Sequence, residues 1–103
     1  MKKLRILLVC SAGMSTSMLV KKMQDYCRKN GLDYEIQAMS SAMGKPQLDQ
    51  WDICLIGPQV SYIANEFKSV TKIPVEIIPS QIYALGKGDK AIEFTHKLLG
   101  ITV

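Results

Sequence analysis

The sequence has few of the residues from which metal and redox sites are built. It contains one histidine, His96, and three cysteines, Cys10, Cys27 and Cys54, in 103 residues. An odd number of cysteines without a C-x-x-C motif predicts neither a disulfide framework nor a zinc site. We therefore expect no metal, no cofactor and a reducing, cytoplasmic setting. We expect His96 to be a solvated side chain near a helix end, where cations are favoured.

Long apolar runs and strong charge are also missing. Arg5 interrupts the first apolar run and leaves residues 6–9 before Cys10, fewer than the ~7–15 residues of a signal-peptide core. Val9 is also bulky where signal cleavage needs a small residue, and no window approaches the ~18 apolar residues of a membrane span. The net charge is +4, without a basic tract interleaved with aromatics. We expect neither direct membrane insertion nor nucleic-acid binding.

Segments typical of strands alternate with segments typical of helices. With 48% apolar residues, a chain of this length forms one domain over residues 1–103. Apolar runs at residues 4–9, 52–57 and 74–79, and an alternating pattern at 33–39, predict four strands. A loop rich in serine, glycine and proline is expected between the second and third.

Helical spacing of apolar residues predicts three helices. The first ends at Asn30-Gly31, the second opens at Pro58, and the third runs from an Asp89 N-cap to Gly100. Strands alternating with helices predict a three-layer, doubly wound α/β fold, with a four-stranded parallel sheet of order 2-1-3-4 and helices on both faces. The chain then turns from one side of strand 1 to the other, so a crevice is expected at the carboxyl end of that strand.

Cys10 leaves strand 1 at this crevice and is followed by small, mostly polar residues and a helix. A helix N-terminus in front of the sulfur favours the thiolate, and a loop of small residues lets successive backbone amides surround an anion. The sequence predicts Cys10 as a nucleophile, whereas Cys27 and Cys54 are expected to pack in the core. The predicted phosphate-binding loop consists of Ser11, Ala12, Gly13, Met14, Ser15, Thr16 and Ser17.

The loop differs from known phosphate-binding motifs. Neither G-x-x-x-x-G-K-[ST] nor G-x-G-x-x-G occurs. The low-molecular-weight tyrosine phosphatases, whose sheet is similar, carry a Cys-x5-Arg loop, but Thr16 stands at the arginine position here and the chain has no Asp-Pro pair to supply a general acid. A loop with a nucleophile and an anion nest, but without these two groups, is suited to storing a phosphoryl group.

Three further stretches carry information on the family: ILLVCSAGMSTSMLVKKM, ICLIGPQVSYI and IPVEIIPSQIYALGKGD. They closely resemble the enzyme IIB proteins of the lactose and cellobiose branch of the bacterial sugar phosphotransferase system (PTS), and the resemblance extends over essentially the whole chain. The first stretch is nearer to the cellobiose or diacetylchitobiose members than to the lactose members.

The resemblance implies a phosphotransferase. Cys10 would accept a phosphoryl group from a phosphohistidine of enzyme IIA and pass it to a sugar, such as cellobiose or diacetylchitobiose. The sugar would be delivered by the membrane-embedded enzyme IIC, with which this cytoplasmic protein would associate. Two other functions stay open: a phosphatase-like enzyme and a non-catalytic regulatory module on the same fold.

Residues after the other strands are candidates for framing the phosphate loop or contacting partners. Met14 and Met18 are candidates for an exposed apolar contact, although Met18 is also a candidate core residue. The polar and aromatic candidates are Gln59, Tyr62, Ser80, Gln81 and Tyr83.

Overall fold

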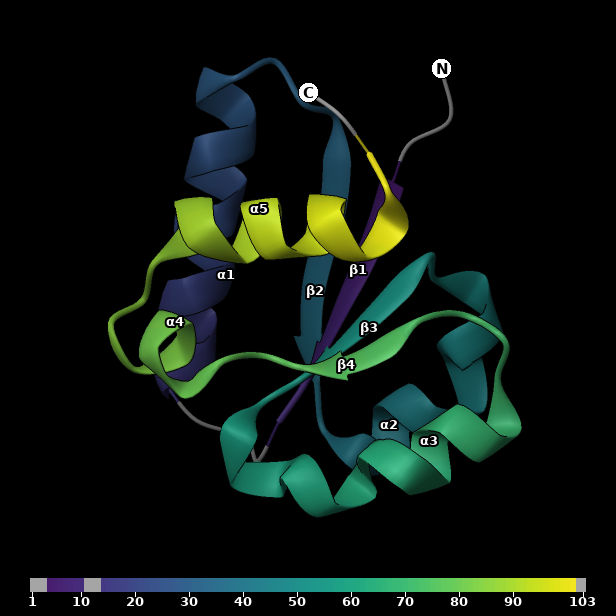
Figure 1. The fold of residues 1–103 in the computed structure, drawn as a ribbon. Coiled ribbons are helices and arrows are strands. Elements are labelled where there is room, and N and C mark those ends of the chain that lie inside the picture. Colours follow the sequence, from purple (N-terminus) through teal and green to yellow (C-terminus); the bar gives the residue numbers. More distant parts are fainter. Residues whose placement is uncertain (1–3, 11–13, 102–103) are drawn as a thin grey trace.

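The computed structural model describes residues 4–10 and 14–101, and for residues 14–16 the backbone alone. Strands alternate with helical segments along the chain (Figure 1). The strands are β1 (Leu4–Val9), β2 (Tyr34–Met39), β3 (Ile53–Ile56) and β4 (Val75–Ile77). The helices are α1 (Met14–Lys29), α2 (Ser41–Gly44), α3 (Ala64–Val70), α4 (Ser80–Ala84) and α5 (Gly88–Leu99), with two 3₁₀ segments, η1 (Lys45–Gln50) and η2 (Pro58–Ile63).

The four strands form a parallel sheet of order β2-β1-β3-β4. β1 lies inside the sheet, with Leu8 opposite Ala38 of β2 and Leu55 of β3. The predicted topology is therefore confirmed. Because the strands are parallel, their carboxyl ends lie at one edge of the sheet, and the segments that follow them meet there.

One face of the sheet is covered by α1, α4 and α5. Ile6 and Leu8 of β1 point to this face and belong to one buried cluster with Leu19 and Met23 of α1 and Ile92 of α5. The apolar residues whose spacing predicts the first helix are thus the residues that face the sheet. Figure 1 shows α5 crossing α1 on this side.

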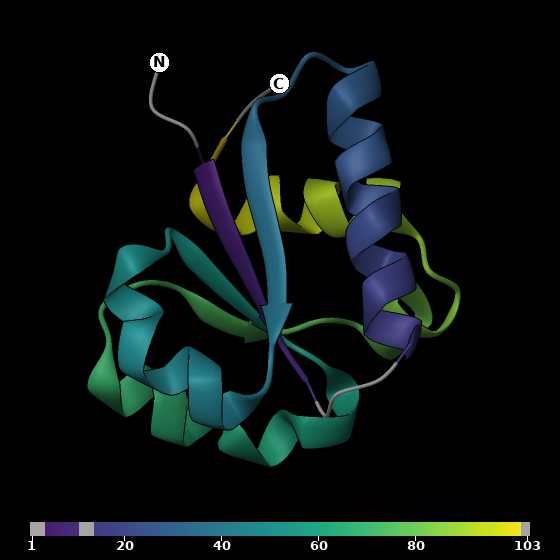
Figure 2. The ribbon, with the colours of Figure 1, turned by 180° about the vertical axis from the view of Figure 1, so that it is seen from behind.

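The opposite face is covered by shorter helical segments. Leu7 and Val9 alternate with the residues of the first cluster and pack with Leu48 of η1, Ile63 of η2 and Phe67 of α3. Seen from behind, α2 and α3 lie across the sheet from α1 (Figure 2). The prediction of helices on both faces is confirmed, and a strand buried on both faces explains the continuous apolar run in β1.

The structure differs from the sequence prediction in its short helices. Segments α2 and η1 occupy the region expected to be a loop, and α4 follows β4 directly. Each is too short to display a helical period in sequence. Asp89 is not an N-cap, because α5 begins at Gly88 and Asp89 lies in its first turn. Gly31 and Gly100 have φ of 67° and 70°, as expected for glycines that follow helix ends.

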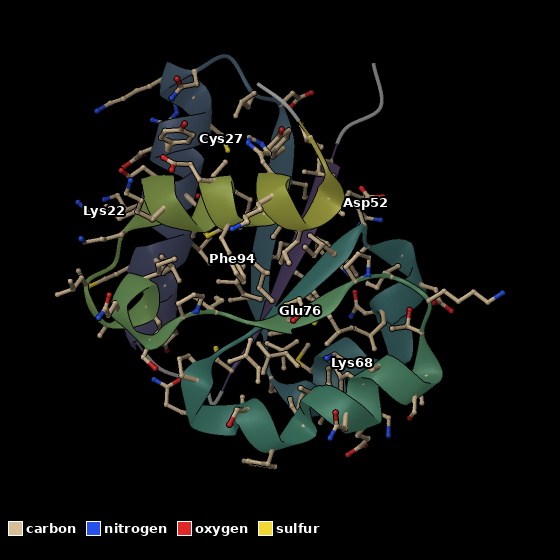
Figure 3. The ribbon with its side chains drawn as sticks, in the orientation of Figure 1. Lys22, Cys27, Asp52, Lys68, Glu76 and Phe94 are labelled. Carbon is tan, nitrogen blue, oxygen red and sulfur yellow. The ribbon has the colours of Figure 1, made fainter. Side chains whose placement is uncertain are left out.

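Arg5 fixes β1 between its neighbours at the amino edge of the sheet. Its backbone N–H donates to Oδ2 of Asp52 at 2.8 Å. Asp52, labelled in Figure 3, is the residue that precedes β3 in the chain. The guanidinium of Arg5 donates to Glu35 Oε1 of β2 at 3.2 Å and to the Gln50 carbonyl at 2.6 Å, and lies 4.5 Å from the Trp51 ring centroid. The polar residue that interrupts the apolar run therefore ties three parts of the fold together, leaving the opposite edge for the site.

His96 is buried, so the prediction of a solvated histidine is wrong. It retains 8% exposure near the end of α5. Its Nε2 lies 2.7 Å from the Tyr34 hydroxyl of β2, and the two rings meet edge to face. Burial lowers the pKa of His96, against a smaller raising effect of Glu93. The imidazole is therefore held in its neutral form by its surroundings.

We expect acid to destabilise the protein through His96. A folded-state pKa below the unfolded value means that the unfolded chain binds more protons as pH falls through about 6.5, so folding stability decreases there. Urea unfolding of wild type and His96→Gln at about pH 7.5 and about pH 5.5 measures this contribution. The variant, whose amide can still bond to Tyr34, should lose less stability on acidification; equal losses would contradict the prediction.

No helix in the described part of the chain is long and apolar enough to cross a membrane.

Candidate functional site

Cys10 lies at the carboxyl edge of the sheet, where three strands end together. Its backbone N–H donates to the carbonyl of Met39 at the end of β2, at 3.2 Å. The N–H of Gly57, directly after β3, donates to the carbonyl of Val9 at 2.8 Å. Cys10 is 5% exposed. The nucleophile predicted from the sequence is thus held by backbone hydrogen bonds at the point where the topology places a crevice.

The helix after Cys10 begins earlier than the sequence predicts. The backbone of Met14, Ser15, Thr16 and Ser17 forms the start of α1, where serine and threonine are well tolerated because their hydroxyls can bond to free backbone groups. This first turn contains no acidic residue, so no side chain of its own neutralises the positive end of the helix dipole. A helix N-terminus of this kind favours an anion nearby.

Ser11, Ala12 and Gly13 lie outside the described residues, so the anion nest stays a prediction.

Gly57 permits a close approach of the β3 end to Cys10. A Cβ atom built on Gly57 would lie 3.0 Å from Cys10 Cβ, 3.0 Å from Gln59 Oε1 and 3.6 Å from Tyr83 Cε2. The structure therefore brings Gln59 and Tyr83, two of the candidates after strands 3 and 4, next to the nucleophile. Ser80 and Gln81 lie exposed in α4, and no contact of theirs with Cys10 is observed in the described residues.

The residues that directly follow the four strands carry no negative charge. Residues 10–24, 40–48, 57–65 and 78–88 contain no aspartate or glutamate, although they include four lysines. Lys45 pairs with Glu66 of α3, whereas a second lysine, Lys87, precedes α5. A doubly charged phosphoryl group at this edge meets no carboxylate from these segments.

The other two cysteines are in core positions, as predicted. Cys54 of β3 is fully buried, and burial raises its pKa to about 12. Cys27 is 4% exposed near the C-terminal end of α1 (Figure 3), and burial raises its pKa to about 11. Both thiols therefore stay protonated at neutral pH and are poor nucleophiles.

The part of the chain that the structure describes contains no group of three histidine, cysteine, aspartate or glutamate side chains able to hold a metal ion.

Exposed apolar side chains follow the carboxyl ends of all four strands. Met18 of α1 is 61% exposed and is not a core residue, and Tyr62 of η2 is 80% exposed. Met43 and Leu85, which the sequence analysis did not single out, are 63% and 66% exposed. A hollow of about 150 Å³ between α1 and α4 is lined by Met18, Leu85 and Tyr83. Tyr83 also approaches Gly57, so the hollow lies near the candidate site. The four exposed residues are spread over most of the chain. Only the sheet topology, which brings the segments after the strands to one edge, relates them to one site.

Known proteins resemble this chain over most of its length. The profile of the family described as "PTS system, Lactose/Cellobiose specific IIB subunit" matches residues 5–94. The oligo-beta-mannoside-specific EIIB component of Bacillus subtilis is 42% identical over 92 residues, covering 86% of this chain and 89% of that protein. The cellobiose-specific EIIB component of Lactococcus lactis is 38% identical over 105 residues, covering 91% and 94%.

Solved structures agree with this relationship. The cellobiose-specific phosphotransferase IIB component from Borrelia burgdorferi superposes with a TM-score of 0.78 at 32% identity, covering 94% of this chain and 92% of that one. The lactose-specific IIB domain from Streptococcus pneumoniae has a TM-score of 0.83 at 18% identity, covering 93% and 97%, and shows the shared fold. The chain therefore belongs to the lactose/cellobiose-specific IIB subunits of the bacterial sugar phosphotransferase system.

Proposed function

We propose that this IIB subunit carries a phosphoryl group on Cys10, receives it from a phosphohistidine of enzyme IIA, and passes it to a sugar delivered by enzyme IIC. The observation that carries the proposal is the position of Cys10. It follows β1 at the carboxyl edge of the sheet and precedes α1, and the residues that directly follow the four strands include no carboxylate. Its two rivals, Cys27 and Cys54, are core thiols with raised pKa values.

The proposed reaction consists of two transfers that use the same sulfur. In the first, the Cys10 thiolate attacks phosphorus, the S–P bond forms as the N–P bond of phosphohistidine breaks, and the imidazole nitrogen keeps the electron pair. In the second, a sugar hydroxyl oxygen attacks phosphorus, the S–P bond breaks, the thiolate is released, and the hydroxyl proton passes to a base at the sugar site. Positioning and stabilisation of charge dominate both transfers, and the N-terminus of α1 offers such stabilisation in each.

Storage between the two transfers follows from what the surroundings of Cys10 lack. Hydrolysis needs an acid or base to activate water, and the residues that directly follow the strands, 10–24, 40–48, 57–65 and 78–88, include no carboxylate. Thr16, at the position of the phosphatase arginine, has no guanidinium to clamp the phosphoryl oxygens. These features favour a carrier over a phosphatase.

The exposed apolar residues around the site support docking of partner proteins there. Met18, Met43, Tyr62 and Leu85 are exposed, and each lies in the segment that follows a different strand at this edge. Methionine side chains adapt to differently shaped surfaces. One surface could therefore serve enzymes IIA and IIC in turn, which a carrier requires.

We propose a disaccharide such as cellobiose or diacetylchitobiose as the sugar. The first stretch of the sequence resembles those members, and one relative is cellobiose-specific. Other relatives are described as specific for oligo-beta-mannosides and galactose, in agreement with enzyme IIC selecting the sugar. The sugar phosphate formed with enzymes IIA and IIC in membranes tests this choice, and failure of onward transfer would favour a regulatory module.

Intact-mass measurement tests the carrier function directly. Incubation with phosphorylated enzyme IIA should add the mass of one phosphoryl group, and peptide mapping should place it on Cys10. Absence of the adduct, or its location on another residue, would overturn the proposal.

We also expect very slow hydrolysis of p-nitrophenyl phosphate. The general acid and arginine of a phosphatase have no counterparts among the residues of the segments after the strands, and general acid catalysis alone contributes about 10²–10⁴-fold. Turnover should therefore be at least about 100-fold slower than that of a low-molecular-weight phosphatase assayed in parallel. Comparable turnover would support the phosphatase alternative.

A further inference from the structure

Gln59 of η2, two residues after Gly57, places a carboxamide near the nucleophile. Its Oε1 and the Cβ of Cys10 both lie 3.0 Å from the same point, the place that a Cβ on Gly57 would occupy. The side chain is exposed overall, yet its Oε1 lies close to Gly57. The glycine leaves the space that this arrangement needs.

The chemistry of a carboxamide suits a thiophosphate at this place. Rotation about the last side-chain bond exchanges Oε1 and Nε2, so the amide can present an N–H donor at the place beside Gly57 that Oε1 occupies. A hydrogen bond to a charged acceptor is stronger than one between neutral groups. The amide is also neutral and cannot activate water as a carboxylate would.

We propose that Gln59 donates a hydrogen bond to the phosphoryl group on Cys10 and thereby stabilises the phosphorylated protein. This inference rests on the proposed phosphocysteine. Gln59 holds the phosphoryl group from the β3 side, in addition to the N-terminus of α1. Its single neutral donor binds the group less tightly than an arginine fork, so the phosphoryl group is retained but can still leave for a sugar.

The equilibrium of transfer distinguishes a phosphoryl contact from a contact with enzyme IIA. The overall equilibrium constant describes the reaction of phosphorylated IIA with IIB to give IIA and phosphorylated IIB. All four proteins in this reaction are counted as free, outside the complex. Contacts made only within the complex alter the rates in both directions and cancel in this constant. A hydrogen bond from Gln59 to the phosphoryl group persists in free phosphorylated IIB and therefore shifts the constant.

The decisive variants are Gln59→Met, which keeps the length of the side chain without the donor, and Gln59→Glu, which keeps its shape but adds negative charge. Mixtures of phosphorylated IIA and each IIB variant, brought to equilibrium, are quantified by intact mass. We expect Gln59→Met to lower the constant about ten-fold and Gln59→Glu to lower it further. Gln50→Met, an exposed glutamine before β3 at the opposite edge, is the matched control and should leave it unchanged.

The outcomes separate this inference from the function on which it rests. If wild type takes up no phosphoryl group, the proposed function fails. If wild type is phosphorylated and Gln59→Met has the wild-type constant, the inference on Gln59 is wrong, whether or not the rates change. Because Gln59 is exposed, the variants should unfold at the wild-type urea concentration, so a shifted constant at unchanged stability supports the phosphoryl contact.

Discussion

Replacing Cys10 with serine is expected to slow the proposed transfer of a phosphoryl group to sugar by at least about 1,000-fold. The hydroxyl of serine is not ionised at neutral pH and has no base beside it in the segments after the strands. It therefore attacks a phosphohistidine poorly. Any phosphoserine that did form would have an O–P bond, whose leaving group is worse than a thiolate. Rates measured with enzymes IIA and IIC and a labelled phosphoryl donor test the prediction.

The remaining cysteines supply matched controls. Cys27→Ala and Cys54→Ala each remove a thiol whose pKa burial raises, to about 11 and about 12, and neither thiol faces the carboxyl edge. Both variants should retain the phosphoryl adduct on Cys10, while losing some stability because a buried sulfur leaves a small cavity. Transfer that survives in Cys10→Ser, or disappears in a folded Cys27→Ala, would contradict the assignment of the nucleophile.

Most of the fold could be predicted because its strongest signals are local. The apolar run of β1 is interrupted only by Arg5, and such a run indicates a strand buried on both faces. The order of the strands then places Cys10 at the switch point without knowledge of any contact. Helix ends at Gly31 and Gly100 were likewise predictable, because positive φ favours glycine.

The features that could not be predicted depend on contacts between distant residues. His96 is buried against Tyr34, which lies 62 residues earlier in the chain, and one sequence does not reveal that pairing. Met18 follows the helical period closely enough to be a core candidate, but it lies at the margin of the buried face of α1. Leu85 stands out only once α4 is placed beside α1.

The sequence predicts Cys10 as the nucleophile and offers Gln59 as one of several neighbouring candidates. Only the geometry around Gly57 separates Gln59 and Tyr83 from the other candidates. The start of α1 at Met14 also could not be read from the sequence, since serine and threonine suit loops and first helical turns alike. Ser15, Thr16 and Ser17 therefore lie in the first turn of α1 and not in a loop, and their role in phosphate binding stays a prediction.

Gly88→Ala is expected to destabilise the protein by about 3 kcal/mol or more, because α5 begins in contact with the backbone of α1. A Cβ on Gly88 would lie 2.3 Å from the carbonyl carbon of Lys22 and 2.4 Å from the nitrogen of Met23. Neither atom can move unless α1 or α5 shifts as a whole. Such a shift would separate α5 from the shared cluster that contains Met23 and Ile92.

Gly86→Ala is the matched control for this prediction, since it lies two residues away in the same connection. Gly86 has a φ of 59° and open space around its Cα, so an added methyl group there causes backbone strain of about 1 kcal/mol without a clash. Urea unfolding of both variants should place Gly88→Ala well below Gly86→Ala in stability. Equal stabilities would mean that backbone conformation, and not the close approach of α5 to α1, limits what this connection tolerates.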